Sequence, residues 1–372
     1  MKKRIIKVLY VNGGIMDRGG VSSVMMNYYS HIDPKTIKID FLVHGLRTGV
    51  YDKEILEKGS KIYRVVPKSK NLIQNYKEIK KIILNGEYDI VHAHADSGNA
   101  YILKIAKECG VKIRISHSHN TNYTIKNKVR IFLNDIQKQK IKQYATDLWA
   151  CSKLAAKWLY GKEDNVYIVN NAIDMERYQY NENCRSCIRK EYNLMDNFVV
   201  GMVGRLGYQK NHDYAIDIIS SLKKYIPKVK LVICGDGELK EELLQKINEK
   251  KVQDETLLTG QVNNIDEFYS AFDVLIMPSH FEGLPVSIVE AQCNGLPCVL
   301  SNKITKEVEI TNNIVYLPIK STDIEKWCRA VIEAKRNRIS KEEFIKSGFD
   351  IESEAKRITK KYCSLVNVSG EK

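Results

Sequence analysis

Met277-Pro-Ser-His-Phe-Glu-Gly-Leu-Pro-Val-Ser-Ile-Val-Glu-Ala-Gln-Cys-Asn-Gly-Leu-Pro297 contains the most informative junction of a strand with a helix in this chain. It continues an apolar run at residues 274–277, which is typical of a buried strand. Pro285 suits the first turn of a helix, and Gly295 suits the position just past its end. The stretch therefore predicts the strand, loop and helix of an α/β unit.

Two acidic residues stand eight positions apart across this junction. Glu282 falls in the predicted loop and Glu290 in the second turn of the predicted helix, so both can face one ligand. The backbone N–H groups of Gly283 and Leu284 suit an anion, because the amino end of a helix carries partial positive charge. The alternative is that Glu282 is a helix cap and Glu290 a solvated helix residue.

The same alternation of apolar runs and helix-like stretches fills the rest of the chain. In the first half the expected elements are residues 5–11, 21–31, 39–43, 71–84, 90–94, 100–108 and 113–116. In the second half they are residues 199–203, 214–225, 230–234, 238–249, 256–258, 265–271, 274–277, 286–293 and 298–301. This rhythm predicts an α/β fold with two doubly wound, Rossmann-like domains, each built on a parallel sheet.

A length of 372 residues also favours two domains over one core. We expect an N-terminal domain over residues 1–185 and a C-terminal domain over residues 186–350. The polar stretch near residues 176–197 is predicted to be the linker, and a helical stretch within 351–372 could join the N-terminal domain. Ligands of parallel sheets bind beyond the carboxyl ends of the strands, so a site in the cleft between the domains is expected.

Composition narrows the class of protein further. The chain is 44% hydrophobic and 28% charged, which is typical of a soluble globular protein, and no apolar run reaches the length of a bilayer. Nine scattered cysteines indicate free thiols in a reducing cytoplasm, because the pair Cys184 and Cys187 has no second pair to complete a zinc site.

The net charge of +14 is unevenly distributed. Residues 1–185 hold 32 Lys and Arg against 18 Asp and Glu, whereas residues 186–372 hold 27 against 27. The excess of positive charge in the first half therefore predicts an anionic partner such as a membrane surface or a phosphorylated lipid. Its basic stretch 126–142 has apolar residues at helical spacing and is a candidate interfacial helix, or alternatively an ordinary domain helix with a solvated basic face.

Three further clusters follow predicted strands. Gly204 and Arg205, with Lys210 close behind, suit a diphosphate, although surface charge is the alternative. The pair Gly19 and Gly20 lets the backbone approach a phosphate or sugar closely, or simply makes a tight turn.

Histidines form the last cluster. His92 and His94 end one predicted strand, His117 and His119 end another, and a spacing of two places each pair on one face. A substrate contact by at least one of them is expected. A hydrogen-bonded structural role and a metal site are the alternatives.

Taken together, these clusters resemble the family 4 retaining glycosyltransferases of the GT-B fold, also called glycosyl transferases group 1. The E-x7-E signature of that family matches Glu282 and Glu290, and Gly204-Arg205 with Lys210 supports it. The stretches 89–94 and 115–120 are similar to the branch that builds bacterial capsules and exopolysaccharides. The sequence D-x-D, which bridges metal and nucleotide in another large class of such enzymes, is absent.

The resemblance assigns roles to individual residues. It implies that Glu290 binds the ribose of a nucleotide sugar, that Glu282 contacts the transferred sugar, and that Arg205 and Lys210 hold the diphosphate. The implied donor site comprises Gly19, Gly20, Arg205, Lys210, Gly235, Val262, Glu282, Gly283, Leu284 and Glu290. The implied catalytic set comprises His117, His119, Arg205, Lys210 and Glu282, with His117 as the better match to the acceptor-side histidine.

The implied activity is transfer of a sugar with retention, without a metal or other cofactor beyond the nucleotide sugar, which we expect to be UDP-linked. The expected acceptor is a lipid-diphosphate-linked saccharide at an anionic membrane, with the protein peripheral on the cytoplasmic face. A sugar-nucleotide epimerase and a non-catalytic partner subunit are the alternatives. A nucleic-acid partner is not expected, because no recognition motif accompanies the charge.

Overall fold

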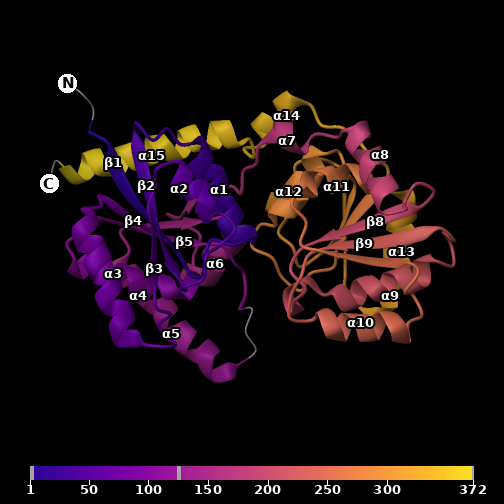
Figure 1. The fold of residues 1–372 in the computed structure, drawn as a ribbon, viewed down its shortest axis with the longest axis horizontal. Coiled ribbons are helices and arrows are strands. Elements are labelled where there is room, and N and C mark those ends of the chain that lie inside the picture. Colours follow the sequence, from indigo (N-terminus) through magenta and orange to yellow (C-terminus); the bar gives the residue numbers. More distant parts are fainter. Residues whose placement is uncertain (1–3, 124–126, 371–372) are drawn as a thin grey trace. The chain divides into compact units, whose positions relative to one another are not determined.

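The computed structural model describes residues 4–123 and 127–370, which fold into two compact α/β units (Figure 1). The first unit comprises Met1–Ala172 together with Ile351–Lys372, and the second comprises Ile173–Asp350. Each unit contains one parallel sheet, so the predicted fold class of two Rossmann-like domains is confirmed.

Within the described residues, the first unit has a seven-stranded sheet in the order β3-β2-β1-β4-β5-β6-β7. Its strands are β1 (Ile6–Asn12), β2 (Ile37–His44), β3 (Ile62–Val65), β4 (Ile90–His94), β5 (Ile113–Ser118), β6 (Asp147–Ala150) and β7 (Tyr167–Ile168). Its helices are α1 (Gly20–His31), α2 (Asp52–Glu57), α3 (Leu72–Gly86), α4 (Asn99–Glu108), α5 (Lys128–Tyr144), α6 (Lys153–Tyr160) and α15 (Ile351–Gly370).

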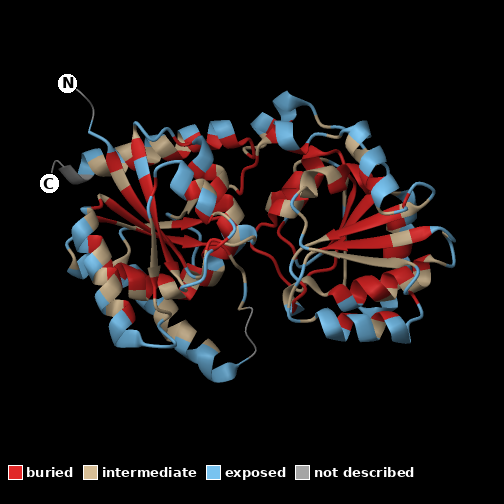
Figure 2. Ribbon diagram, in the orientation of Figure 1, coloured by how far each residue is buried: buried red, intermediate tan, exposed pale blue. Residues whose placement is uncertain are grey.

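The central strand β1 of this sheet is largely apolar because helices cover both faces of the sheet. Leu9 and Val11 of β1 pack with Val91 of β4 against residues of α3 and α4 in one continuous core. Figure 1 shows α1 and α15 on the other face, and Figure 2 shows that the strands form the buried centre of the unit. The strand order reverses between β1 and β4, which is where such folds place their ligands.

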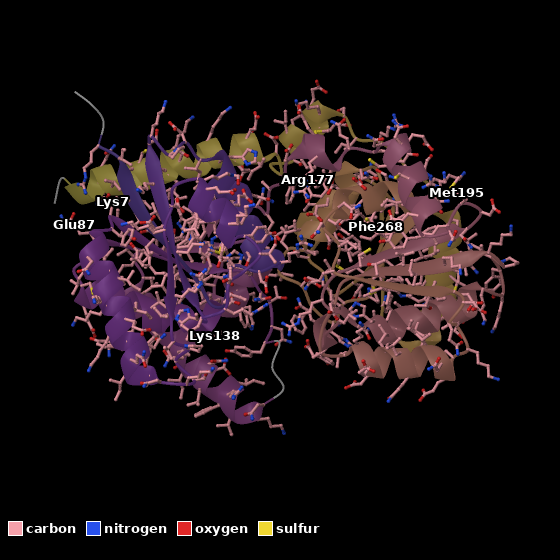
Figure 3. All side chains as sticks on the ribbon, viewed as in Figure 1. Lys7, Glu87, Lys138, Arg177, Met195 and Phe268 are labelled. Carbon is pink, nitrogen blue, oxygen red and sulfur yellow. The ribbon has the colours of Figure 1, made fainter. Side chains whose placement is uncertain are left out.

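The second unit, over its described residues, has a six-stranded sheet in the order β10-β9-β8-β11-β12-β13. Its strands are β8 (Phe198–Val203), β9 (Val229–Cys234), β10 (Thr256–Gly260), β11 (Val274–Met277), β12 (Cys298–Ser301) and β13 (Ile314–Leu317). Its helices are α7 (Met175–Tyr178), α8 (Glu182–Glu191), α9 (His212–Leu222), α10 (Lys240–Glu249), α11 (Ile265–Ala271), α12 (Val286–Cys293), α13 (Ile324–Glu333) and α14 (Lys341–Lys346). Phe268 of α11, labelled in Figure 3, lies fully buried in this unit.

The boundary between the units differs from the expected one. The chain divides after Ala172, so residues 173–185 belong to the second unit, and the stretch expected to be a linker contains α8. Arg185 and Arg189 fasten α8 by donating to backbone carbonyls at the end of α11 and to the carboxylate of Asp273. The helix has one aliphatic residue, the buried Ile188, so its mostly polar composition made it look like a linker.

The C-terminal helix folds with the first unit. Ile351, Ala355, Ile358 and Tyr362 of α15 are all buried, and their spacing forms one apolar stripe along the helix. Residues 371 and 372 of the predicted stretch lie outside the described residues.

The cysteines of the chain carry free thiols. Across residues 4–123 and 127–370, no helix combines the length and the apolar character needed to cross a bilayer.

Candidate active site

The second unit gathers the predicted donor residues at the carboxyl edge of its sheet. The loops after β8 and β9 touch there, with the Gly204 N–H donating to the Cys234 carbonyl at 3.0 Å. Gly235 has φ of 157°, and a Cβ at this position would lie 1.9 Å from the Gly204 carbonyl oxygen. Only glycine fits this approach, so the backbone itself forms one wall of the site.

Glu282 is held by a complete set of partners. Its Oε1 accepts from the Ser279 hydroxyl at 2.8 Å and lies 2.9 Å from the Lys210 Nζ, while its Oε2 accepts from Gln209 Nε2 at 3.1 Å. The Glu282 side chain is 7% exposed and the Lys210 side chain 15%. The carboxylate is therefore fixed in orientation, and Lys210 reaches the edge of β11 from the neighbouring β8 loop.

Glu290 lies on α12, as the sequence predicts, and is also buried. The Tyr269 hydroxyl donates to its Oε2 at 2.6 Å, and the Tyr178 hydroxyl contacts the same carboxyl group. Burial raises the pKa of Glu290, and these hydrogen bonds together with the charge of Arg177 oppose that rise. The site thus contains a desolvated carboxyl group that two tyrosines orient.

Arg205 lies differently from Lys210. Its side chain is 76% exposed and forms a surface ion pair with Glu238 at 2.9 Å. Exposed pairs of this kind are weak, so Arg205 can exchange Glu238 for another anion at small cost.

The remaining predicted residues of this unit line the same edge. Gly283 and Leu284 lie between β11 and α12, and Val262 lies between β10 and α11. Parallel strands end at one edge, which is why residues from three loops meet there.

Gly19 and Gly20 belong to the first unit, where they precede and begin α1. Both are exposed, and a Cβ at either position would meet no atom within 4 Å of the described structure. Within this unit nothing requires glycine at these positions, so the open space is available to a ligand.

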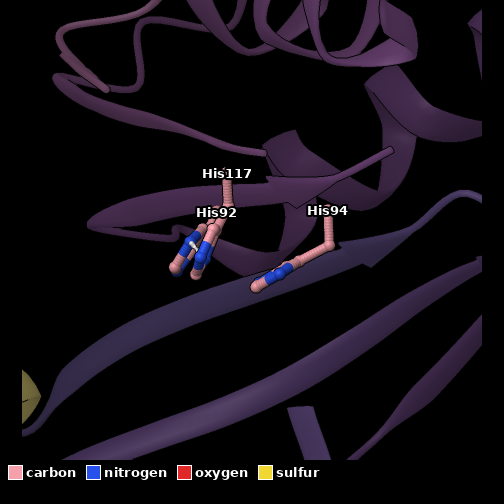
Figure 4. Close-up of side chains that lie close together, drawn as sticks. All are labelled: His92, His94 and His117. Carbon is pink, nitrogen blue, oxygen red and sulfur yellow. Dashed lines mark hydrogen bonds between the residues drawn. The ribbon is translucent and has the colours of Figure 1, made fainter. Parts of the chain in front are cut away.

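The four predicted histidines form one buried cluster in the first unit. His92 and His94 come from β4, whereas His117 lies in β5 next to its last residue, Ser118, and His119 follows the strand. His92 Nε2 lies 3.1 Å from His117 Nδ1, and His94 Nδ1 lies 2.9 Å from His119 Nε2. Figure 4 shows His92 and His117 stacked, with His94 beside them.

Burial keeps these imidazoles neutral. Desolvation lowers the pKa of all four rings, that of His119 to about 3, and the neighbouring histidines lower the pKa of His92, His94 and His117 further. Neutral imidazoles can ligate metal, and ring nitrogens of His92, His94 and His117 lie within 4.8 Å of one another. Of their nitrogens, His92 Nε2, His117 Nδ1 and His94 Nδ1 form hydrogen bonds between the rings, whereas His94 Nε2 and His117 Nε2 have no partner in the described structure.

Sequence reasoning missed the tyrosines that support both clusters. Tyr269 and Tyr178 orient Glu290, and Tyr362 contacts His92 Nδ1 at 2.7 Å. Tyr362 stands 270 residues from His92, so no local spacing could have identified it.

Helix α5 contains most of the basic stretch for which an interfacial helix and an ordinary domain helix were the two alternatives. Val129, Phe132 and Leu133 are 68%, 65% and 55% exposed, and Ile141 is the one buried residue of the helix. Lys138, labelled in Figure 3, is held by Asp135 and the Trp158 ring. Lys128, Arg130, Lys140 and Lys142 are exposed. Residue 126 of the prediction lies outside the described residues.

This fold and this site define a sugar-transferring enzyme, and comparison with known proteins agrees. The family described as glycosyl transferases group 1 matches residues 185–350. EpsF of Bacillus subtilis (strain 168), which is named a glycosyltransferase, is 31% identical over 98% of this chain and 97% of its own length. The chain therefore belongs to the group 1 glycosyltransferases.

Two further proteins are similar to this chain. An Escherichia coli enzyme named UDP-Gal:alpha-D-GlcNAc-diphosphoundecaprenol alpha-1,3-galactosyltransferase is 29% identical over 80% of each chain. Among solved structures, Anabaena HepE in complex with UDP and glucose has a TM-score of 0.80 at 18% identity, covering 96% of this chain and 100% of HepE. The likeness in fold confirms the predicted GT-B class.

Proposed function

We propose that this glycosyltransferase moves a sugar from a UDP-linked donor to a lipid-diphosphate-linked saccharide during capsule or exopolysaccharide synthesis. The observation that carries the proposal is the pairing of Lys210 with Glu282 in the loop before α12, the helix that carries the buried Glu290. The names of the Escherichia coli relative and of the HepE complex support UDP as the nucleotide of the donor, and the name of the former supports a lipid-diphosphate-linked acceptor.

The donor contacts follow from the chemistry of each side chain. Glu290 accepts hydrogen bonds from the ribose hydroxyls, and Glu282 accepts from a hydroxyl of the transferred sugar. Arg205 and Lys210 hold the diphosphate, because a guanidinium fork and an ammonium both suit phosphate oxygens. The remaining donor contacts come from the backbone around Gly19, Gly20, Gly235, Val262, Gly283 and Leu284.

We assign the reaction to the retaining, metal-independent type. The bond between sugar C1 and the diphosphate oxygen loosens first, and UDP leaves with the bonding electrons. Arg205 and Lys210 stabilise the charge that grows on the leaving group. The acceptor oxygen then attacks C1 on the same face, and a phosphate oxygen of UDP takes the hydroxyl proton. The two cations supply the charge that a divalent metal supplies in enzymes with D-x-D.

The first unit supports an anionic, membrane-borne acceptor. It holds 35 Lys and Arg against 18 Asp and Glu, whereas the second unit holds 24 against 27. Each cation near an anionic leaflet contributes about 1 kcal/mol. Helix α5 adds exposed apolar residues to this charge, so we place the protein on the cytoplasmic face of the membrane as a peripheral enzyme.

The test is transfer from UDP-glucose, UDP-galactose or UDP-N-acetylglucosamine to a short-chain polyprenyl-diphosphate N-acetylglucosamine, with and without EDTA. We expect a product larger by one sugar, with the anomeric configuration of the donor retained and the rate unchanged by EDTA. Glu290→Ala should abolish transfer, whereas Glu242→Ala on the exposed face of α10 should not. Conversion of the donor sugar without acceptor would instead identify an epimerase.

A further inference from the structure

Four buried side chains of the first unit form one hydrogen-bonded chain that ends at His117. The Tyr10 and Tyr362 hydroxyl oxygens lie 3.1 Å apart, Tyr362 lies 2.7 Å from His92 Nδ1, and His92 Nε2 lies 3.1 Å from His117 Nδ1. Each of the four is at most 2% exposed. The chain links β1, α15, β4 and β5, four segments that are distant in sequence.

The direction of these hydrogen bonds is set at the tyrosine end. The Tyr10 hydroxyl has one partner among the described residues, the Tyr362 hydroxyl. A buried donor without an acceptor is costly, so the Tyr10 proton points to the Tyr362 oxygen. Tyr362 must then give its own proton to His92 Nδ1.

The direction of the bond from Tyr362 also fixes which nitrogen of each imidazole is protonated, because a neutral ring carries one N–H proton. His92 accepts at Nδ1, so its proton is on Nε2 and is donated to His117 Nδ1. His117 therefore carries its proton on Nε2, and the His117 Nε2–H is the one group of the four that this direction leaves unpaired. The reverse direction would leave both the Tyr10 proton and the His117 Nε2 lone pair without a partner.

We propose that Tyr362 and His92 are positioning residues that fix His117 as an uncharged Nε2–H donor to an oxygen of the bound substrate. His117 Nε2 is buried and has no hydrogen-bond partner in the described structure, so this N–H still needs an acceptor, which the substrate oxygen would supply. The substrate part of this inference rests on the proposed function, whereas the tautomer does not.

This tautomer changes what His117 can do. An Nε2 that already bears hydrogen cannot take the proton of the attacking hydroxyl, so His117 is not the base. It orients a substrate oxygen instead. That oxygen is either a hydroxyl of the donor sugar or an oxygen of the lipid-linked acceptor.

The tautomer is read directly from nitrogen-15 spectra of the full chain labelled at its eight histidines. Spectra that correlate ring nitrogens with ring carbon-bound protons separate a protonated nitrogen from a bare one. We expect His117 to show a protonated Nε2 and a bare Nδ1 at neutral pH. A bare Nε2 in the unmodified protein would overturn the inference, and this result needs no variant to fold.

Two matched variants test the role of the tyrosines. Tyr362→Phe removes the only donor to His92 Nδ1 in the described chain. Either direction of the hydrogen bond between His92 and His117 then leaves the same number of polar groups unpaired. His117 should therefore show both tautomers at comparable population. Tyr10→Phe also removes one buried hydroxyl, but Tyr362 still donates to His92, and His117 should be unchanged. If both variants changed the His117 tautomer alike, or if Tyr362→Phe left it unchanged, the proposed role of Tyr362 would be refuted.

Titration with substrates then identifies the oxygen. UDP-glucose alone shifts the His117 Nε2–H signal if the oxygen belongs to the donor, and the short-chain polyprenyl-diphosphate N-acetylglucosamine alone shifts it if the oxygen belongs to the acceptor. If neither probe shifts the signal although the transfer assay shows that both are used as substrates, the proposed contact between His117 and the substrate is overturned. If no transfer occurs, the proposed function fails while the tautomer assignment stands on the ligand-free spectrum.

Discussion

Lys210 Nζ lies 2.9 Å from Glu282 Oε1, so the cation assigned to the diphosphate is neutralised by the carboxylate assigned to the sugar. Both side chains are largely buried, and Ser279 and Gln209, which also contact this carboxylate, are neutral. Under the proposed donor contacts, a diphosphate would compete with Glu282 for Lys210. Glu282 would then be freer to accept from a sugar hydroxyl, which would couple recognition of the two parts of the donor.

Replacing Lys210 should harm turnover more than donor binding. Lys210→Ala removes charge that is most useful when the diphosphate departs, and loss of one such stabilising group typically lowers kcat by about 100- to 1,000-fold. Lys240→Ala, an exposed lysine that begins α10, is the matched control. Steady-state kinetics with the accepted donor checks this. An unchanged kcat with a raised KM would mean that Lys210 binds ground state and transition state equally.

The hydrogen bond between Tyr269 and Glu290 should affect donor affinity. Tyr269→Phe leaves the buried carboxyl group with fewer partners, and we expect a loss of stability of about 1–3 kcal/mol and weaker UDP binding. Glu290→Gln keeps the shape but removes the charge, and should bind UDP more weakly than the unmodified protein. Calorimetric titration with UDP measures both variants. Tight binding by Glu290→Gln would show that the ribose does not need a carboxylate.

Local motifs were predictable, and contacts across the sheet were not. Glu282 and Glu290 were placed correctly on their loop and helix because their strand, proline and glycine are neighbours in the sequence. The pairing of Lys210 with Glu282 depends instead on β8 lying beside β11, which the strand order decides. The contact between Tyr362 and His92 needs the last helix to return to the first sheet, and apolar spacing along α15 does not show where it docks.

Elements held by polar anchors or lying at sheet edges also escaped prediction. Helix α8 is fastened by Arg185 and Arg189 and has a single aliphatic residue, Ile188, so its mostly polar sequence resembles a linker. Strands β3 and β7 lie at the edges of their sheet and are mostly half-buried, and their short sequences lack the continuous apolar run of a central strand.

The buried histidines should make the protein unstable in mild acid. Burial lowers the pKa of His212 and of His119 to about 3, below the value near 6.5 of an unfolded chain. The unfolded state therefore binds more protons below pH 6.5, and the stability present above that pH is lost as the pH falls. Each histidine contributes a loss of about 2 kcal/mol between pH 7.5 and pH 5.

Thermal unfolding across this pH range checks the effect. His212→Leu should flatten the pH dependence, because both ring nitrogens of His212 lack a partner in the described structure and leucine has no charge to gain. His31→Gln, at an exposed position on α1, should leave the pH dependence unchanged. A pH dependence that His212→Leu does not reduce would mean that His212 is protonated in the folded state.

Helix α5 should be the part of the first unit that enters the membrane interface. Phe132 and Leu133 are 65% and 55% exposed beside exposed cations such as Arg130 and Lys140. Burying such a side chain in an apolar environment is worth about 1.5–3 kcal/mol, so Phe132→Ser with Leu133→Ser should weaken vesicle binding by at least 10-fold. The paired control is Ile332→Ser, an exposed apolar residue of the second unit.

Flotation with vesicles of phosphatidylcholine, with or without phosphatidylglycerol, separates the apolar contribution from the ionic one. The unmodified protein should bind the anionic vesicles and release them as salt rises, because screening weakens the attraction between cations and lipid phosphates. The double variant should bind anionic vesicles more weakly, and all of its remaining binding should be salt-sensitive, since it retains Arg130 and Lys140. If it floats as well as the unmodified protein, α5 is not the inserting helix. If neither binds, the acceptor must be reached from solution.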